Sequence, residues 1–242
     1  MFNKRQYQIL AERYLESMAG DLPSLLWMVG QAPLIAGLII LRWRSWQATD
    51  TLYFVLALSA VWFGCSNACR EIAKERAIYR RERLYGLNVA AYLAAKVKIL
   101  TLVGLVEIFL FYFLTARYLD TDLAAFPAFL TLFALYFSGM ALGLFLSRWC
   151  GSVNRAVVAV PIVIIPQIVF SKFVLPKSAM TGVALKVEKL MVVKWGFEAL
   201  THSKRGEFAF GDYLPAMIIL FALGLLFLFL TLIHLWFAGE DS

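Results

Sequence analysis

NACREIAKERAIYRRERLYGLNVAAYLAAK, residues 67–96, contains the most highly charged stretch of an otherwise apolar chain. Between Arg70 and Arg83 it holds three glutamates and six Lys or Arg residues. Hydrophobic runs flank it on both sides. Its closely spaced opposite charges are typical of a short surface helix, and Gly86 and Asn88 indicate a break after that helix. We therefore expect residues 69–88 to lie on the membrane surface between two spans.

The composition predicts a membrane protein. Charged side chains make up 16% of the 242 residues and hydrophobic side chains 62%, whereas soluble domains carry roughly 25% charged residues. Apolar runs of about 20 residues, enough to cross a hydrocarbon core, recur between short polar breaks. We predict an all-α integral membrane fold in which residues 1–242 form a single transmembrane domain.

The hydrophobic runs predict six transmembrane helices, an even number that places both termini on the same side. The fifth is interrupted by Pro161, Pro166 and Gln167, so we expect it to be kinked or broken. We expect residues 174–212, between spans five and six, to form an external segment that is either re-entrant or lies close to the membrane. The predicted spans are 22–41, 51–67, 99–115, 126–146, 156–173 and 213–237.

Residues 1–21 precede the first span and are amphipathic. Tyr7, Leu10, Tyr14 and Met18 fall on one helical face, which favours a helix at the membrane interface. The alternative is a solvated helix that packs on a soluble partner.

The Lys and Arg residues favour a cytoplasmic N-terminus. With that orientation, three lie inside in the N-terminal helix, eight between Arg70 and Lys98, and two between spans four and five, against ten outside. The inside cluster is compact and adjoins two spans. The net charge of +7 then reflects orientation and contact with anionic membrane lipids, so no nucleic-acid partner is expected.

The charged stretch has two readings. It could be a solvated loop that binds lipid headgroups, but its glutamates would face anionic headgroups unfavourably. A protein partner with its own mixed charge fits better.

The same residues carry a resemblance to a known family. Residues 67–96 resemble the coupling helix and the start of span three in ABCG (White) type ABC exporters, with Glu75 and Glu82 framing a basic and aromatic core. RQYQILAERYLESM, residues 5–18, is similar to the connecting helix of that family. QIVFSKFVLP, residues 167–176, is similar to its span-five exit, and VVKWGFEAL, residues 192–200, to its membrane-proximal external helix.

The resemblance implies a stand-alone half-permease without a fused ATPase domain, in the bacterial inner membrane. Its expected partners are an ABC ATPase, present in two copies, and a second permease protomer, identical or a close homologue. ATP and Mg²⁺ would be bound by the ATPase, and no cofactor by this chain. The exported compound would be a lipid, a lipid-linked glycan or an amphipathic molecule. The residues implied to contact the ATPase are Glu71, Glu75, Arg76, Tyr79, Arg80, Glu82 and Arg83.

The resemblance also assigns residues inside the membrane. Phe63 would face a central cavity between protomers, unless it is an ordinary core or lipid-facing side chain. Phe173 and Val174 match an apolar plug above that cavity, although Lys172 stands where the family usually has glycine.

Glu107 and Gln167 are polar residues within predicted spans. An ionisable group at membrane depth is a functional candidate by default. Glu107 could therefore serve an ion-coupled secondary transporter, the alternative to an ATP-driven exporter, or it could be a neutral structural acid. Gly139 and Gly143 form a GxxxG step that permits close helix packing.

Common catalytic signatures are missing. The sequence has no GxxxxGK[ST] loop for phosphates, no GxSxG elbow and no HExxH pair. Cys65 and Cys69 share a helical face, but they supply too few ligands for a metal site. We expect a transport subunit that is not an enzyme by itself and binds no metal.

Overall fold

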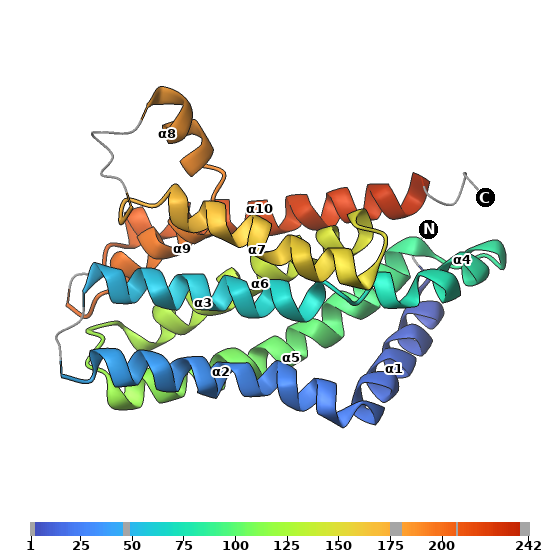
Figure 1. Cartoon of the computed structure of the whole chain (residues 1–242), viewed down its shortest axis with the longest axis horizontal. Helices are drawn as coiled ribbons and strands as arrows, with labels where there is room; N and C mark the ends of the chain where they lie inside the picture. The colour runs from blue at the N-terminus through green and yellow to red at the C-terminus, as the bar shows by residue number, and fades with distance from the viewer. Residues whose placement is uncertain (1–2, 46–48, 175–180, 207, 238–242) are drawn as a thin grey trace.

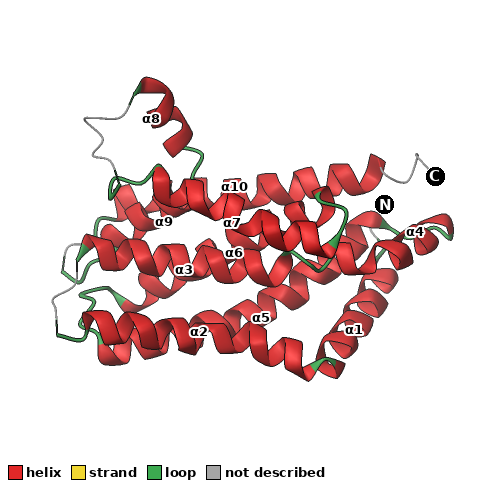
Figure 2. Ribbon diagram, viewed as in Figure 1, coloured by secondary structure: helices red, strands yellow, loops and turns green. Residues whose placement is uncertain are grey.

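The computed structural model describes residues 3–45, 49–174, 181–206 and 208–237, and it is helical almost throughout (Figures 1 and 2). Within these ranges the β-structure is one isolated bridge between Leu123 and Lys204. The fold class predicted from the sequence is confirmed. The helices are α1 Lys4–Gly20, α2 Leu22–Trp43, α3 Asp50–Ala68, the 3-10 turn η1 Ala73–Glu75, α4 Arg76–Leu84, α5 Val89–Tyr118, α6 Ala125–Trp149, α7 Val153–Val169, α8 Gly182–Glu188, α9 Val192–Thr201 and α10 Phe210–Phe237.

The long helices α2, α3, α5, α6, α7 and α10 run between two ends of the molecule. One end carries α4, together with the start of α1 and the end of α10, and the other carries α8 and α9 (Figure 1). Within the described part of the chain, five helical stretches are long and apolar enough to cross a membrane. They are Leu22–Trp43, Asp50–Leu84, which begins with α3, Val89–Tyr118, Ala125–Trp149 and Phe210–Phe237.

The fifth predicted span, 156–173, differs most from the structure. Helix α7 is continuous through Pro161 and Pro166, but it has 17 residues and ends at Val169. At 1.5 Å per residue it is about 26 Å long, less than a hydrocarbon core of about 30 Å. The backbone leaves the helix in two turns, with Ser171 N–H donating to Ile168 O and Val174 N–H to Ser171 O. Residues 170–173 of the predicted span are therefore turns and a bend rather than helix.

The core is centred on the contact between α3 and α6, the most extensive in the described chain. Glycines allow this approach, since a Cβ on Gly64 would lie 2.1 Å from Tyr136 O, and one on Gly139 would lie 2.3 Å from Val61 O. Gly143 meets Cys65 O in the same way. The expected packing role of Gly139 and Gly143 is thus confirmed.

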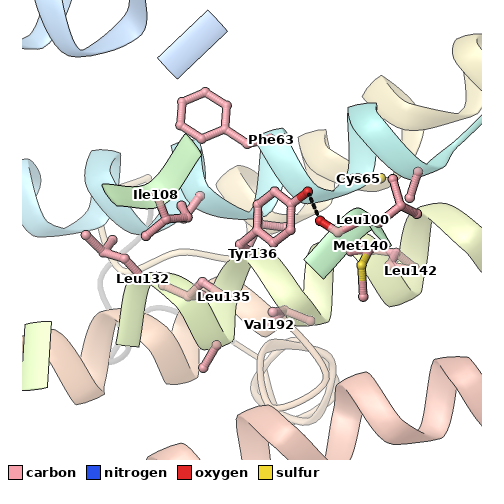
Figure 3. Close-up of a cluster of buried hydrophobic side chains, with 14 of the residues drawn as sticks. Phe63, Cys65, Leu100, Ile108, Leu132, Leu135, Tyr136, Met140, Leu142 and Val192 are labelled. Atoms are coloured by element: carbon pink, nitrogen blue, oxygen red, sulfur yellow. Dashed lines mark hydrogen bonds between the residues drawn. The ribbon is translucent and has the colours of Figure 1, made fainter. Parts of the chain in front are cut away.

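Neighbouring helices join this core through a few buried polar bonds. Tyr136 OH donates to Leu100 O of α5 at 3.0 Å, within the buried cluster shown in Figure 3. Ser138 Oγ donates to Leu220 O of α10 at 2.9 Å. In each bond a buried hydroxyl group donates to a backbone carbonyl of a neighbouring helix, which satisfies the hydrogen-bonding requirement of the hydroxyl inside the protein.

Helix α1 lies across the α4 end of the molecule and packs on α5 (Figure 1). Leu10, Tyr14 and Met18 are buried and Tyr7 is half-buried, which confirms the predicted apolar face. Asp21 separates α1 from α2, and its carboxylate caps α2 by accepting from Ser24 N–H. Bonding with Ser24 lowers the pKa of Asp21.

The glycine contact predicts a selective loss of stability. Gly139→Ala should destabilise the protein by about 1–3 kcal/mol, because the added methyl meets backbone that cannot move away. Gly37→Ala is the matched control, since a Cβ there has nothing within 4 Å. Thermal unfolding in detergent measures both, and equal stability of the two variants would contradict the packing described here.

Candidate functional site

The coupling segment, defined here as residues 70–88, follows α3 directly. It consists of η1 and α4 rather than the single helix predicted over 69–88. The chain breaks at Gly86, which has a φ of +85°, and Asn88 then caps α5 by accepting from Ala91 N–H. The break expected at these two residues is confirmed.

The inner part of the coupling segment is fixed by Glu71. This carboxylate is buried, accepts a hydrogen bond from Tyr14 OH of α1, and pairs with Lys74 at 2.7 Å. Burial and the adjacent Glu71 raise the pKa of Tyr14 well above its usual value. The tyrosine therefore stays protonated and keeps donating across the physiological range.

Glu75 makes the second anchor. Its carboxylate pairs with Lys96 of α5 at 2.8 Å and accepts from Tyr92 OH at 3.2 Å. The Lys96 ammonium is buried and lies 4.0 Å from the centre of the Tyr14 ring. One cation thus connects the coupling segment, α5 and α1.

Helix α4 is held at further points around its surface. Glu82 pairs with Arg13 of α1, a bond that raises the pKa of Arg13. Tyr79 OH donates to Leu235 O of α10 at 3.0 Å, and Arg76 donates to Gly151 O at 2.8 Å. Three parts of the chain therefore position this short helix: α1, α10 and the turn at Gly151.

These contacts leave one face of the coupling segment free. We call it the outer face, and its exposed residues are Ile78, Arg80, Arg81, Leu84 and Tyr85. Leu84 at the end of α4 is 75% exposed, and Tyr85, the next residue, is 86% exposed.

The sequence-predicted ATPase contacts divide into two groups. Arg80 is exposed on the outer face, whereas Glu71 and Tyr79 are buried against other helices of the same chain. The remaining members are half-buried and bonded within the chain: Glu75, Arg76, Glu82 and Arg83.

A cavity of about 560 Å³ lies between α2, α3 and α7. We call it the membrane cavity. Its lining is mainly apolar and aromatic, with polar atoms at one wall. The lining residues are Trp27, Met28, Gly30, Gln31, Leu34, Ile35, Trp62, Ser66, Asn67, Cys69, Arg70, Val157, Val160 and Pro161.

The polar wall is a chain of hydrogen bonds. Gln31 Nε2 donates to Asn67 Oδ1 at 2.8 Å, and Asn67 Nδ2 donates to Glu107 Oε2 at 2.7 Å. Glu107 is fully buried behind Asn67 and does not line the cavity. Its carboxyl group thus has side-chain partners within the protein.

Phe63 is a core side chain in this chain, in agreement with the second of its two interpretations. It is fully buried and packs edge-on against Phe111, with ring centres 5.1 Å apart. The aromatic residue of α3 that lines the membrane cavity is Trp62. Successive residues of a helix point in directions about 100° apart. Trp62 therefore faces the membrane cavity while its neighbour Phe63 faces the core.

The predicted plug residues also separate. Phe173 packs between Phe54 and Phe197, at 4.9 and 5.4 Å between ring centres, whereas Val174 is exposed. Lys172 pairs with Asp50 at 2.8 Å and lies over the Phe197 ring. Residues 175–180 and 207 of the predicted external segment lie outside the described residues.

Gln167 has a packing role in the structure. It is buried, and its side-chain oxygen accepts from Val193 N–H at 3.0 Å. This bond satisfies one of the free N–H groups at the start of α9, and it joins α9 to the end of α7.

Sequence reasoning missed Gln31, Trp62, Asn67 and Arg70 as cavity residues. Gln31 carries a usable signal, because it is a polar side chain inside an otherwise apolar run. Trp62 and Arg70 carry none, since which face of α3 meets α7 depends on tertiary packing.

The Glu75–Lys96 anchor predicts an asymmetric response to mutation. Lys96→Met should destabilise the protein by about 3 kcal/mol, because a largely buried carboxylate loses its cation. Adding Glu75→Met should restore most of that loss, since two apolar groups then pack together. Denaturant titration in mixed micelles gives the free energies. A double variant no more stable than Lys96→Met would contradict the ion-pair assignment.

Comparison with known proteins agrees with this architecture. A family profile described as "ABC-2 type transporter" matches residues 5–204, which include α1, the coupling segment, the membrane cavity and α9. No significant match is found among curated proteins. Members of the matched family are multi-pass transport subunits that associate with an ABC ATPase. The profile covers most of the chain, and the chain therefore belongs to the ABC-2 type transporter family, as a permease subunit.

Proposed function

We propose that this chain is the membrane subunit of an ATP-driven exporter whose ATPase binds the outer face of the coupling segment. The observation that carries the proposal is the combination of that exposed face with rigid internal anchoring. A partner can bind the exposed face of this segment and move it. Because the opposite face is bonded to other helices, those helices would move with it.

The route from the outer face to the membrane cavity is short. Only the turn at residues 69–72 separates α3 from η1, and Arg70 and Cys69 within this turn line the cavity. Glu75 and Tyr79 tie the same segment to α5 and α10. Movement of α4 would therefore change the walls of the cavity.

The proposed assembly contains two permease chains, identical or closely homologous, and two ATPases. ATP and Mg²⁺ are bound by the ATPases, and the permease provides the path. The end of the molecule carrying α4 faces the cytoplasm, with both termini, and the membrane is the bacterial inner membrane. This orientation agrees with the basic residues clustered at that end.

The membrane cavity is the proposed binding place for the exported compound. Its volume falls within the roughly 300–1,000 Å³ of small-molecule sites, and its aromatic and apolar lining suits a lipid, a lipid-linked glycan or an amphipathic compound. Release passes the cluster of Phe173, Phe54 and Phe197 at the far end. An ion-coupled mechanism through Glu107 is less well supported, because Asn67 separates that carboxyl group from the cavity.

The proposed ATPase contact predicts a loss of association without loss of folding. Arg81→Glu combined with Tyr85→Ala should reduce co-purification of the ATPase by about tenfold or more, because an interface hot spot contributes about 2 kcal/mol. Lys186→Glu, an exposed charge reversal on α8 at the other end, is the control. Undiminished co-purification by the double variant would remove the outer face from the interface.

The proposed binding place predicts that filling it blocks transport. Gly30 lines the membrane cavity and a Cβ there has open space around it, so Gly30→Leu adds bulk without a clash. ATP hydrolysis should lose its stimulation by added bacterial polar lipids while basal hydrolysis remains. Gly37→Leu, on the same helix and outside the cavity, should behave as wild type. Full stimulation in Gly30→Leu would rule the cavity out.

A further inference from the structure

A second cavity adjoins the first at the α4 end of the molecule. It has a volume of about 470 Å³ and lies between the turn from α1 to α2, the coupling segment and Val153 at the start of α7. We call it the interface cavity. Met28 and Arg70 line both cavities. The mainly apolar membrane cavity and the more polar interface cavity therefore meet at Arg70.

The acidic groups of the interface cavity are already engaged. Asp21 accepts from Ser24 N–H, Glu71 pairs with Lys74 and accepts from Tyr14, and Glu75 pairs with Lys96. These carboxylates have partners of their own within the cavity wall.

Arg70 differs from its basic neighbours. Lys74 pairs with Glu71, Arg76 donates to Gly151 O and Arg83 donates to Leu87 O. Arg70 is half-buried as a residue, and within the described parts of the chain its guanidinium makes no hydrogen bond and no ion pair within 4 Å. The nearby Asp21 carboxylate interacts with Arg70 electrostatically, but the N–H groups of the guanidinium remain available as donors to an anion that enters the junction.

We propose that the exported compound is an amphiphile with a phosphate ester, whose phosphate binds Arg70 and whose apolar portion occupies the membrane cavity. This inference rests on the function proposed above. Guanidinium groups bind phosphate oxygens through two parallel N–H donors, and Arg70 stands where a headgroup at the interface and a chain in the membrane would join.

The apolar part of the ligand has matching surroundings. Trp27, Leu34 and Ile35 of α2 face Val157 and Val160 of α7 across the membrane cavity. The tryptophans at positions 27 and 62 offer flat surfaces for an alkyl chain. A ligand that fits both places therefore has a charged group at one end, beside Arg70, and an apolar chain at the other end, in the membrane cavity.

Two sources share this chemistry, since anionic and zwitterionic phospholipids both carry a phosphate diester. Asp21 and Lys74 also line the interface cavity, so a headgroup amine or hydroxyl has neighbours there as well. The phosphate is the part that Arg70 recognises in either case.

The test uses the full chain purified in maltoside micelles with its co-purifying ATPase. Bromine-labelled hexadecyl phosphate and bromine-labelled hexadecanol are titrated separately, and binding is followed by quenching of tryptophan fluorescence, because Trp27 and Trp62 line the cavity. Bromine-labelled phosphatidylglycerol and phosphatidylethanolamine then distinguish the anionic from the zwitterionic source. The variants are Arg70→Gln, Arg70→Lys, Gly30→Leu and the control Lys186→Gln.

We expect the phosphate probe to bind at least about tenfold more tightly than the alcohol, the effect of one charge-assisted hydrogen-bonded contact. Arg70→Gln should remove this preference while leaving the alcohol affinity unchanged, which also shows that the variant is folded. Arg70→Lys should retain part of the preference, and Lys186→Gln all of it.

Two results would overturn the inference, and they differ. A phosphate preference that survives in Arg70→Gln, while Gly30→Leu blocks both probes, refutes Arg70 as the phosphate site and leaves the cavity as the binding place. Undiminished binding of both probes in Gly30→Leu refutes the membrane cavity as the binding place, while the proposed ATPase contact is refuted separately, by undiminished co-purification of the Arg81→Glu, Tyr85→Ala variant.

Discussion

The ion pair between Glu75 and Lys96 is the constraint on which the functional arrangement depends. It fixes the coupling segment to α5 at a point that is nearly excluded from solvent, where Lys96 also contacts the Tyr14 ring of α1. Removing two charges from water is costly, and a buried pair is often no more stable than two apolar side chains. We infer that its value here is positional, because the directed contacts of Glu75 with Lys96 and Tyr92 restrict where the coupling segment can lie.

That placement connects the two functional regions. With η1 and α4 held from behind, the outer face presents Arg80, Arg81, Leu84 and Tyr85 as one rigid surface. The same anchors lie next to Arg70, where the coupling segment joins α3 and where both cavities meet. In the proposed mechanism, a partner that moves the outer face acts on the proposed binding place over a short distance, and the close packing of α3 on α6 would carry the movement onward as displacement of whole helices.

The sequence predicted the features that local patterns encode. The apolar runs agree with the long helices within a few residues, apart from α5, which begins ten residues before its hydrophobic run, at Val89. The apolar face of α1 and the break at Gly86 were also predicted, since both depend on side-chain periodicity or backbone freedom.

The partners of each charge could not be predicted. Glu71 and Tyr79 read as surface residues of a charged helix, yet the packing of α1 and α10 buries them. Phe63 and Trp62 are adjacent, and only the tertiary placement of α7 decides which one lines a cavity.

The central claim is that the coupling segment lies on the side of the membrane where ATP is available, with α8 on the opposite side. Cysteine accessibility tests this most directly, with Arg80→Cys and Lys186→Cys each placed in a background whose native cysteines are replaced by serine. A membrane-impermeant maleimide added to cells with an intact inner membrane should label position 186, and should label position 80 only after that membrane is permeabilised. Labelling of position 80 in the intact cells would contradict the account, because the outer face would then have no ATPase to bind.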